Sequence, residues 1–306
     1  MTRRVAVTGS TGFIGRHLVA SLAARGDEVR AIHRSKLFDT GELTGLFRGC
    51  DAVVHLAGVV STVDDREYAA VNVEATRAVA AAARAAGARL IHISSLAAAG
   101  PAPVSAPRTE DDPPRPITEY GRSKLESERV VRAVDGLRWT ILRPGVVYGP
   151  GDRALLPLFR YVRRGVLPLI GRSTTAYMFI HISDAVRAIE AAIDRDAHGE
   201  TLFVGHPHPV TVRELLEGVR AAAGRRAAIV RIPPPLGRLA AAFGDVVGAI
   251  RGRPLPLNGR RWAEMNSEGF VCRVDRLRDR LGVVAQVDLR EGLTRTANWY
   301  RQQGWL

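Results

Sequence analysis

The chain has 306 residues and a formal net charge of +13, from 44 Lys and Arg against 31 Asp and Glu. This length is enough to bury a large core as one domain with a smaller lobe. The arginines are dispersed, mostly singly or in pairs, and no basic run is interleaved with aromatic residues. We therefore expect a solvated, Arg-rich surface that attracts an anionic cofactor, and no nucleic-acid partner.

Cysteine content and hydropathy limit the class of protein further. Cys50 and Cys272 are too few for a disulfide framework, and no His or Cys spacing indicates a metal site. No stretch approaches a membrane span, so we expect no membrane partner. The first predicted strand begins at residue 3 or 4, which leaves no room for a signal peptide and predicts a cytoplasmic protein.

The first element along the chain is predicted to be a buried strand over residues 3–7, followed by a glycine-rich turn and a helix over 16–25. Gly9 allows a tight turn, Gly12 lets the backbone approach a pyrophosphate, and Gly15 permits close packing of helix on strand. The free N–H groups at the start of such a helix bind phosphate. Strand, turn and helix together predict a dinucleotide site.

The second predicted strand, over residues 28–34, bears on the choice of dinucleotide. A site for NAD usually ends this strand with an acid that binds the ribose 2′-hydroxyl. Here Glu28 stands at the start of the strand, and its end carries Arg34, Ser35 and Lys36. These three side chains offer a clamp for a 2′-phosphate, so the sequence favours NADP over NAD.

Strands and helices continue to alternate, which predicts a parallel sheet with ligands at the carboxyl ends of its strands. The predicted segments are a strand over 51–58, a helix over 72–86, a strand over 89–95, a proline-rich loop over 101–116, a helix that contains Tyr120, and a strand over 139–143. Ser95, Tyr120 and Pro144 all lie at or just after such strand ends.

Tyr120 and Lys124 are the most informative pair in the chain. The sequence holds 42 arginines but two lysines, Lys36 and Lys124, so a retained lysine indicates a role for a compact ammonium. At a spacing of four, Tyr120 and Lys124 share one helix face. A cation there favours the phenolate and lowers the tyrosine pKa from about 10. Such a tyrosine can pass a proton to or from a substrate oxygen.

Six motifs in this order carry a family resemblance. They are Thr8-Gly9-x-x-Gly12-x-x-Gly15, His55-Leu-Ala-Gly58, Asn72-Val-x-x-Thr76, Ser94-Ser95, Tyr120-x-x-x-Lys124 and Arg143-Pro144-Gly-Val-Val-Tyr-Gly-Pro-Gly-Asp152. The chain resembles the extended short-chain dehydrogenase/reductases, or NAD(P)-dependent epimerase/dehydratase family, nearer the dihydroflavonol-reductase and hydroxysteroid-dehydrogenase branches. The resemblance implies an α/β fold: a Rossmann-type doubly wound parallel sheet with a smaller, discontinuous C-terminal substrate lobe.

The resemblance also implies roles for single residues. Tyr120 matches the catalytic acid/base, Lys124 the residue that holds the nicotinamide ribose and lowers the tyrosine pKa, and Ser95 the hydroxyl that polarises the substrate oxygen. The implied chemistry is hydride transfer between a substrate carbon and nicotinamide C4, while the tyrosine moves the proton. The full set expected to bind the cofactor is Gly9, Thr11, Gly12, Phe13, Ile14, Gly15, Arg34, Ser35, Asp51 (an adenine contact), Leu56, Ala57, Gly58, Asn72, Tyr120, Lys124, Pro144 and Val147.

Departures from the sugar enzymes of this family bear on the substrate. Sugar dehydratases carry Asp-Glu after the catalytic hydroxyl, whereas Ser95 is followed by Leu96 and Ala97, so dehydration is not expected. The stretch 96–99 predicts an apolar pocket wall. The apolar residues between 239 and 250 exceed one helical stripe, which fits either a packed helix or a lid over an apolar substrate.

We therefore expect an enzyme that uses NADP, or less favourably NAD, to reduce a ketone or oxidise the alcohol of a largely apolar small molecule. A nucleotide-sugar epimerase with a recycled hydride stays open, because five arginines could bind a diphosphate. They are Arg231, Arg251, Arg253, Arg260 and Arg261. A non-catalytic dinucleotide sensor is the alternative of another class, although a sensor needs none of Ser95, Tyr120 and Lys124.

The expected domain organisation follows the same resemblance. Residues 1–150 form the dinucleotide-binding domain, to which residues 179–205 return. Residues 151–178 and 206–306 form most of the substrate lobe. A homodimer is the expectation from the family, and the sequence shows no interface for it.

Overall fold

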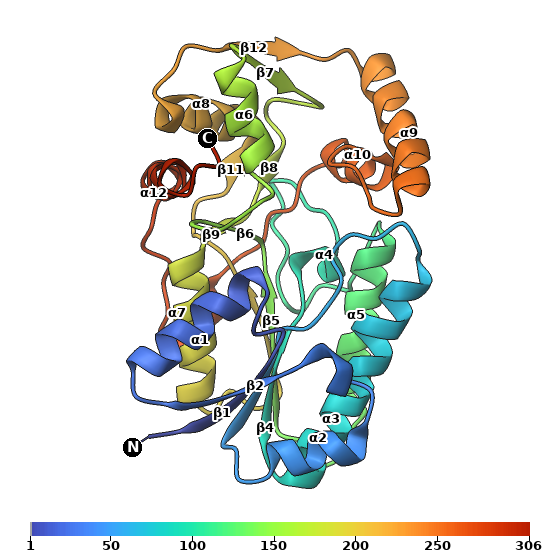
Figure 1. The fold of residues 1–306 in the computed structure, drawn as a ribbon, viewed down its shortest axis with the longest axis vertical. Helices are drawn as coiled ribbons and strands as arrows, with labels where there is room; N and C mark the ends of the chain where they lie inside the picture. Colours follow the sequence, from blue (N-terminus) through green and yellow to red (C-terminus); the bar gives the residue numbers. More distant parts are fainter. Residues whose placement is uncertain (1) are drawn as a thin grey trace.

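Six parallel strands form the central sheet, in the order β10-β5-β4-β3-β1-β2 (Figure 1). The computed structural model describes residues 2–306 of the chain. The strands of the sheet are β1 (Arg4–Thr8), β2 (Glu28–Ile32), β3 (Ala52–His55), β4 (Arg89–Ile93), β5 (Trp139–Pro144) and β10 (Glu200–Val204). The prediction of a doubly wound, Rossmann-type α/β fold is confirmed.

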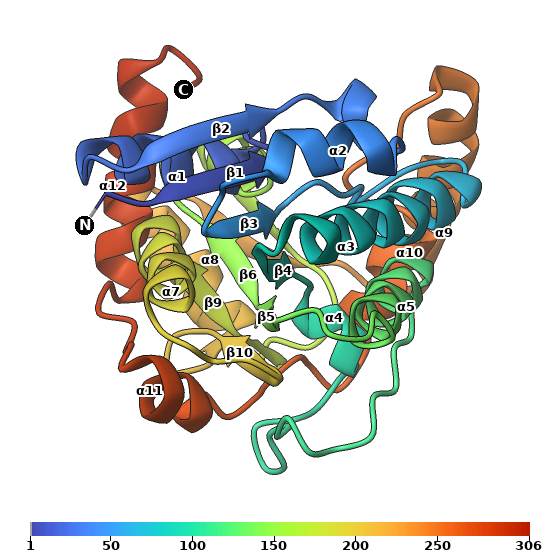
Figure 2. The same cartoon turned by 90° about the horizontal axis from the view of Figure 1, so that it is seen from below.

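Helices cover both faces of this sheet, as Figure 2 shows from below. One face carries α1 (Phe13–Ala24) and α7 (Ile182–Asp194). The other carries α2 (Thr40–Phe47), α3 (Ala75–Ala86) and α5 (Glu119–Arg132). Strands covered on both faces are apolar throughout, and this is why the middle of β1 and all of β3 are buried.

The strand order reverses at β1, and this places a ligand site. From β1 the chain passes outward to β2, then returns across the sheet to β3 on the other side of β1. The helices on either side of such a switch point leave a crevice at the carboxyl ends of the strands. The turns after β1 and β3 therefore border the expected cofactor crevice.

The remaining elements form a second group, above the carboxyl edge of the sheet in Figure 1. Three two-stranded sheets lie here: β6 (Val146–Tyr148) with β9 (Phe179–His181), β7 (Val166–Leu169) with β12 (Ala228–Arg231), and β8 (Ala176–Tyr177) with β11 (Val210–Thr211). The helices of this group are α6 (Leu156–Arg163), α8 (Val212–Ala223), α9 (Pro234–Arg251), α10 (Gly259–Met265) and α12 (Leu289–Gln302). The short α11 (Asp275–Leu281) lies near β10.

Segment 179–205 leaves this second group and rejoins the main sheet. It supplies α7, which packs beside α1, and β10, which pairs with β5. Because this segment returns to the main sheet, we propose that residues 1–150 and 179–205 form the dinucleotide-binding domain, and that residues 151–178 and 206–306 form most of the substrate lobe. None of the helices described over residues 2–306 combines the length and apolar composition needed to cross a bilayer.

The proline-rich loop over residues 101–116 is held against a distant segment. Ala102 N–H donates to the carbonyl oxygen of Gly269, and Arg108 N–H to that of Val271, both at 2.9 Å. At the start of the loop, Gly100 has a φ of +92°, and a Cβ there would lie 2.1 Å from the carbonyl oxygen of Arg115. The loop therefore closes tightly beside the end of β4.

Candidate active site

The glycine turn after β1 packs directly on helix α1. Gly9 has a φ of +67°, a conformation that costs glycine little. A Cβ on Gly15 would lie 2.1 Å from the carbonyl oxygen of Gly9, so no other residue fits there without a shift of the backbone. The tight turn and the close approach of the helix are therefore both built into these two positions.

The start of α1 is open to an anion. Thr11 and Gly12 are exposed, and no side chain caps this helix in the described structure. A Cβ on Gly12 would meet one neighbouring atom, a turn carbonyl oxygen at 3.1 Å. The backbone N–H groups of Phe13 and Ile14 lie in the first helical turn, where a phosphate finds free donors and the positive end of the helix dipole.

Arg34 and Ser35 follow the carboxyl end of β2, next to the end of β1. The Arg34 side chain is 65% exposed and makes one long ion pair, 3.5 Å, with Glu67. Glu28 lies at the other end of β2, where it pairs with Arg4 at 2.8 Å. The cofactor edge of β2 therefore carries an exposed guanidinium and a hydroxyl, while the acid of this strand is at the opposite edge.

Asp51 lies at the wrong edge of the sheet for a cofactor contact. It precedes β3, and its Oδ2 accepts a hydrogen bond of 2.7 Å from the backbone N–H of Arg4, at the start of β1. The length of β3, about 13 Å at 3.3 Å per residue, separates it from the carboxyl edge. The structure corrects the expected adenine contact: Asp51 joins the amino ends of β1 and β3 instead.

Ser95, Tyr120 and Lys124 come together where β4 ends. Ser95 follows β4 and caps the short helix α4 (Leu96–Ala99), since its Oγ accepts a hydrogen bond of 3.1 Å from the backbone N–H of Ala97. The side chains of Ser95 and Tyr120 lie close enough for Ser95 to lower the pKa of Tyr120. One turn along α5, Lys124 Nζ donates to the carbonyl oxygen of Ile93, the last residue of β4, at 2.7 Å. A hydroxyl pair and an ammonium thus lie at the end of one strand.

Burial dominates the titration of these groups. It raises the pKa of Tyr120 to about 12, against the lowering effect of the Ser95 side chain. It also lowers the pKa of Lys124 to about 8, although the charge of Glu128 opposes this. The expected lowering of the Tyr120 pKa by Lys124 is not found, because the phenol is desolvated and the ammonium binds Ile93. At neutral pH Tyr120 is protonated and Lys124 is a cation.

Asn72 ties the turn after β3 to helix α5. It is buried within a π-helical segment (Tyr68–Glu74), a feature that is frequent at functional sites. Its amide accepts a hydrogen bond from Val59 N–H (2.8 Å) and donates to the Val59 carbonyl and to Ser123 Oγ (both 2.9 Å). Ser123 lies on α5 between the two catalytic candidates, so Asn72 fixes the position of that helix over the crevice.

The residues after β3 connect the glycine turn to the catalytic candidates. Leu56 and Ala57 donate their N–H groups to Thr8, to its carbonyl oxygen at 3.3 Å and its hydroxyl at 3.2 Å. A Cβ on Gly58 would lie 3.9 Å from Nζ of Lys124. Leu56, Ala57 and Gly58 therefore run from the end of β1 to the ammonium group.

Pro144 and Val147 lie along the same edge. Pro144 ends β5, and Val147 is the central residue of β6, paired with Ile180 of β9. Both are half-buried. The structure therefore places every predicted cofactor residue except Asp51 at or next to the carboxyl edge of the sheet.

The apolar wall expected over residues 96–99 is mostly wrong. Leu96, Ala98 and Ala99 are at most 3% exposed and pack inward, so of the four residues Ala97 alone is half-exposed. A short helix turns three of its four side chains into the core because its Ser95 cap directs the chain back under α5. Most of the pocket surface must come from other elements.

Helix α10 supplies part of that surface, although the sequence marks its Arg260 only as a possible diphosphate ligand. The ring of Tyr68 lies 6.2 Å from the ring of Tyr120, and the Arg260 guanidinium lies over Tyr68 at 5.5 Å. Glu264 is close enough for its charge to contribute to the raised pKa of Tyr120. These residues reach Tyr120 from elements far apart in the chain, where no local pattern marks them.

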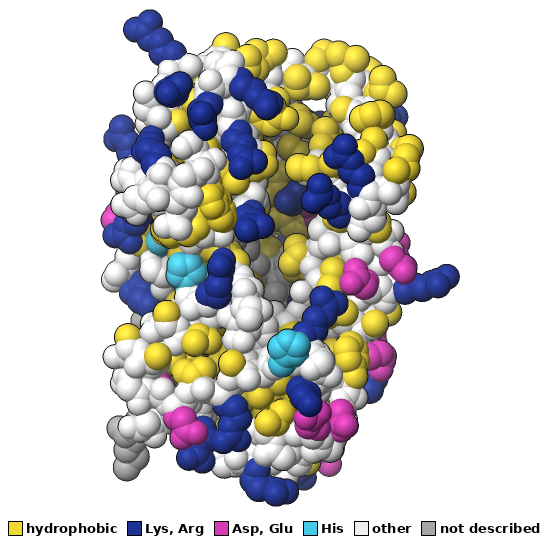
Figure 3. Space-filling model, in the orientation of Figure 1, with side chains coloured by type: hydrophobic (Ala, Val, Ile, Leu, Met, Phe, Trp, Pro, Cys, Tyr) yellow, Lys and Arg dark blue, Asp and Glu magenta, His cyan; other side chains and the backbone are white. Residues whose placement is uncertain are grey.

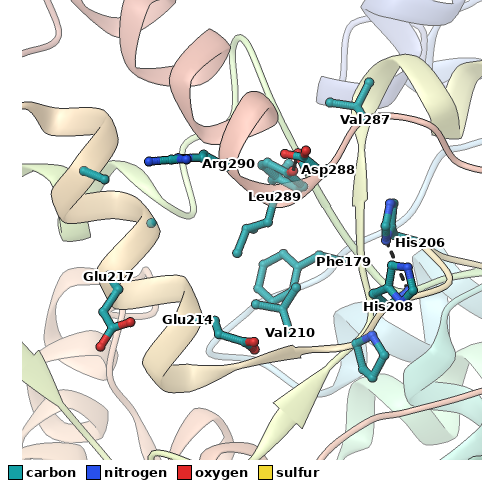
Figure 4. Close-up of a pocket in the computed structure, with 14 residues that line it drawn as sticks. Phe179, His206, His208, Val210, Glu214, Glu217, Val287, Asp288, Leu289 and Arg290 are labelled. Atoms are coloured by element: carbon teal, nitrogen blue, oxygen red, sulfur yellow. Dashed lines mark hydrogen bonds between the residues drawn. The ribbon is translucent and has the colours of Figure 1, made fainter.

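Two hollows lie in the C-terminal group of elements. Figure 3 shows one between β7 and β8 on one side and α9 and α10 on the other, with hydrophobic side chains inside and basic ones at its rim. The other is a cavity of about 490 Å³ between α8 and the start of α12 (Figure 4). Its lining includes Phe179, Val210 and Leu289, and none of Ser95, Tyr120 and Lys124.

This second cavity is therefore not the candidate active site. Two of its acids, Glu214 and Asp288, already cap helices α8 and α12 through backbone N–H groups. Within residues 2–306, no group of three or more His, Cys, Asp or Glu side chains could hold a metal ion.

Comparison with known proteins agrees with this geometry. The model of the NAD dependent epimerase/dehydratase family matches residues 5–205. The chain belongs to this family. Membership in the epimerase/dehydratase family accounts for the parallel sheet with its glycine turn, and it identifies the protein as an NAD(P)-dependent enzyme of the extended short-chain dehydrogenase/reductase type.

Reductases are among the similar members of the epimerase/dehydratase family. The ceramide reductase of Caulobacter vibrioides (strain NA1000 / CB15N) is 31% identical, over 99% of this chain and 96% of its own. The 4-hydroxy-2-methyl-3-oxo-4-farnesyl-3,4-dihydroquinoline-1-oxide ketoreductase of Stigmatella aurantiaca is 30% identical, over 79% of this chain and 80% of its own. The solved structure of MoeE5 with UDP-glucuronic acid and NAD has a TM-score of 0.77 and 27% identity, and it covers 98% of this chain and 99% of its own.

Proposed function

We propose that this enzyme uses NADPH to reduce a ketone, or NADP to oxidise the alcohol, in a largely apolar small molecule. The observation that carries the proposal is the closeness of the Ser95 and Tyr120 side chains at the end of β4, with Lys124 anchored one helical turn away. These groups lie beside the turns after β1 and β3, at the edge where a dinucleotide fits.

The residues around this edge fit a dinucleotide. The open helix start at Gly12, Phe13 and Ile14 suits the pyrophosphate. Arg34 and Ser35 suit a 2′-phosphate, because the guanidinium makes one long ion pair and is largely exposed. When bound, the nicotinamide supplies a hydride to the substrate carbon.

The protein's own residues handle the proton. Tyr120 is protonated at neutral pH because burial raises its pKa to about 12, so its hydroxyl is in the form that donates a proton to the reduced carbonyl oxygen. The Ser95 hydroxyl donates a hydrogen bond to the same oxygen. Lys124 is a cation below about pH 8 and stabilises the phenolate that proton transfer leaves behind.

Three features support an apolar substrate. Ser95 is followed by Leu96 and Ala97, with no acid placed to expel a hydroxyl as water. The hollow between β7 and α10 is lined by hydrophobic side chains (Figure 3). Two relatives are named for ceramide and for a farnesyl-bearing quinoline, both of which carry long hydrocarbon chains.

A nucleotide-sugar epimerase is the second candidate. MoeE5, which shares the fold, was solved with UDP-glucuronic acid and NAD. Of the arginines that could hold a diphosphate here, Arg260 is already engaged, because it binds the Thr62 carbonyl oxygen and forms an ion pair with Asp65. Arg261 pairs with Glu264 at 3.1 Å. Arg231, Arg251 and Arg253 make no ion pair among the residues that the structure describes, so the preference for a ketoreductase rests on the apolar hollow and on the named relatives.

The test is net consumption of NADPH by the purified protein with ketones of increasing alkyl length. We expect consumption, with a rate that increases with chain length until the pocket is filled. Tyr120→Phe should lower turnover about 10²–10⁴-fold while NADPH binding stays near normal. Tyr161→Phe, on an exposed tyrosine of α6, is the matched control and should leave turnover unchanged.

Two outcomes would contradict the proposal. Turnover that survives in Tyr120→Phe would remove the tyrosine from its role. Cofactor that co-purifies with the protein and is never consumed would favour the epimerase, and a UDP-sugar should then be isomerised without added NADPH.

A further inference from the structure

Helix α9 presents an unusual apolar face to solvent. Five large side chains repeat at spacings of three and four residues, which places them on one side of the helix. They are Leu236, Leu239, Phe243, Val246 and Ile250, and each is between 59% and 80% exposed. We call these five residues the α9 apolar face. Figure 3 shows hydrophobic side chains gathered at the upper right, where Figure 1 places α9.

The opposite side of α9 explains why this face points outward. Gly237, Ala241, Gly244 and Gly248 are the buried residues of the helix. A Cβ on Gly244 would lie 2.0 Å from a backbone carbonyl oxygen, and one on Gly237 would lie 2.2 Å from the ring of Trp262. Large side chains cannot fit on this side, so the helix is held by its small residues. From the sequence, this stretch fitted either a packed helix or a lid over the substrate. The structure shows that α9 packs on its neighbours through the side that carries glycine and alanine.

The segment around α9 is strongly basic. Residues 225–258 contain a single acid, Asp245, whose carboxylate accepts a hydrogen bond from Gly259 N–H at 3.0 Å. The same segment contains Arg225, Arg226, Arg231, Arg238, Arg251 and Arg253. All six are exposed, and none takes part in an ion pair among the residues that the structure describes. Arg238 and Arg251 lie on α9 itself, and Arg231 and Arg253 lie close to its two ends in the chain. An apolar face with unpaired arginines on and next to its helix is the composition of a helix that lies in the surface of an anionic membrane.

The α9 apolar face also adjoins the candidate active site. Helix α10 packs on the small side of α9 through Trp262, and its Arg260 and Glu264 approach Tyr68 and Tyr120. The hollow of Figure 3 opens between these two helices and β7 and β8. A second apolar spot borders α10, since Arg260 binds the Thr62 carbonyl oxygen in a loop whose Val60 is 68% exposed.

We propose that α9 docks the enzyme on the surface of an anionic lipid membrane, with its apolar face among the acyl chains and its arginines among the headgroups. When the enzyme is docked in this way, an apolar substrate can pass between the membrane and the hollow beside α10. The exchange step depends on the ketoreductase proposal above, whereas the docking step does not. The expectation that the protein has no membrane partner is revised for peripheral contact.

A second copy of the chain is a poorer occupant for the same face. Two α9 helices packed face to face would bring the arginines of both copies together with one acid, Asp245, on each helix, and this repulsion opposes association. An anionic membrane instead satisfies both the apolar residues and the charge.

The test is co-sedimentation of the full chain with vesicles of phosphatidylcholine alone, or of phosphatidylcholine with phosphatidylglycerol. We expect binding to the anionic vesicles that weakens as salt is added. The double variant Leu239→Ser/Phe243→Ser should bind at least about tenfold more weakly, because it removes two of the five membrane-facing side chains. The matched control Val104→Ser/Val284→Ser changes exposed apolar residues on other elements and should bind like the wild type.

Turnover separates this proposal from the previous one. The α9 variant should reduce a short, water-soluble ketone at the wild-type rate and lose rate with a long-chain ketone embedded in vesicles. Equal vesicle binding by the α9 variant and the wild type would overturn the docking proposal, whatever the turnover. A wild-type dimer that the α9 variant breaks into monomers would overturn it as well, in favour of a second copy.

Discussion

Glu128 and Arg143 form a two-point ion pair that joins helix α5 to strand β5. Arg143 Nε and Nη2 donate to the two carboxylate oxygens of Glu128 at 2.8 and 2.7 Å, and the side chains are 0% and 4% exposed. Burial alone would raise the pKa of Glu128, but the hydrogen bonds and charge of Arg143 outweigh it and lower the pKa. Glu128 also accepts a hydrogen bond from Ser94, next to the candidate catalytic Ser95.

Glu128→Gln should destabilise the protein by about 3–5 kcal/mol, because it leaves the buried guanidinium of Arg143 without a countercharge. Urea denaturation measures this loss. The matched control is Glu126→Gln on the same helix, since Glu126 pairs with Arg129 at 2.9 Å and both side chains are exposed. The control should cost less than about 1 kcal/mol. Similar losses in both variants would mean that the buried pair contributes no more than a surface pair.

The geometry of the glycine turn can be predicted from the sequence, because its requirements are local. The φ of Gly9 and the contact of Gly15 with the Gly9 carbonyl oxygen depend on one short stretch of backbone. The position of Asp51 also follows from local order: it precedes its strand, and the amino ends of parallel strands lie away from the ligand edge. The adenine contact assigned to it from the family match could have been excluded by this argument.

The parts of the site that depend on packing between distant segments could not be predicted. Tyr68 and Glu264 approach Tyr120 from a π-helical segment and from α10, and no pattern near either residue indicates this. The raised pKa of Tyr120 has the same origin, since it results from burial rather than from the residues one turn away. The outward direction of the α9 apolar face depends on the contact of Gly237 with Trp262, which the sequence does not reveal.

Lys124 should make stability depend on pH in a predictable direction. Burial lowers its pKa to about 8 in the folded protein, against about 10.4 in an unfolded chain. Between these two values the unfolded state binds more protons, so the free energy of unfolding rises with pH by about 3 kcal/mol in all. Lys124→Met should be more stable than the wild type near neutral pH and lose that advantage as the pH approaches about 10.

Urea denaturation of both proteins across this pH range measures the effect. Lys36→Met is the matched control, because Lys36 is the other lysine of the chain, is exposed and pairs with Glu42 at 2.5 Å. A stability difference between Lys124→Met and the wild type that does not change with pH would contradict a lowered pKa. Turnover should be lost in Lys124→Met.

Arg34 should discriminate between the two dinucleotides. Arg34→Ala removes charge-assisted hydrogen bonds to a 2′-phosphate, so the Kd for NADPH should rise about ten- to hundredfold. The Kd for NADH should change little, because NADH lacks that phosphate. Arg77→Ala, on an exposed arginine of α3 that pairs with Glu74, is the matched control for lost surface charge. Fluorescence titration of the three proteins with each cofactor measures these constants, and an equal loss for both cofactors in Arg34→Ala would remove the 2′-phosphate clamp.

His55 and His92 should make the protein sensitive to acid. Both are 0% exposed and their rings stack at 5.5 Å. Burial lowers the pKa of His55 to about 3 and that of His92 well below its usual value, and the charge of Lys124 adds to both shifts. His55 is held neutral between the hydroxyls of Thr8 (2.7 Å) and Thr76 (3.0 Å). Protonation of either ring would place a second cation in the core beside Lys124.

Each histidine therefore lowers the free energy of unfolding as the pH falls below about 6.5, because the unfolded chain binds the proton and the folded chain does not. The loss approaches about 1.4 kcal/mol per pH unit for each residue. His92→Gln should roughly halve this dependence, since it leaves His55 alone to titrate. Denaturation at a series of pH values gives both slopes. Equal slopes for His92→Gln and the wild type would mean that His92 takes up its proton in the folded state.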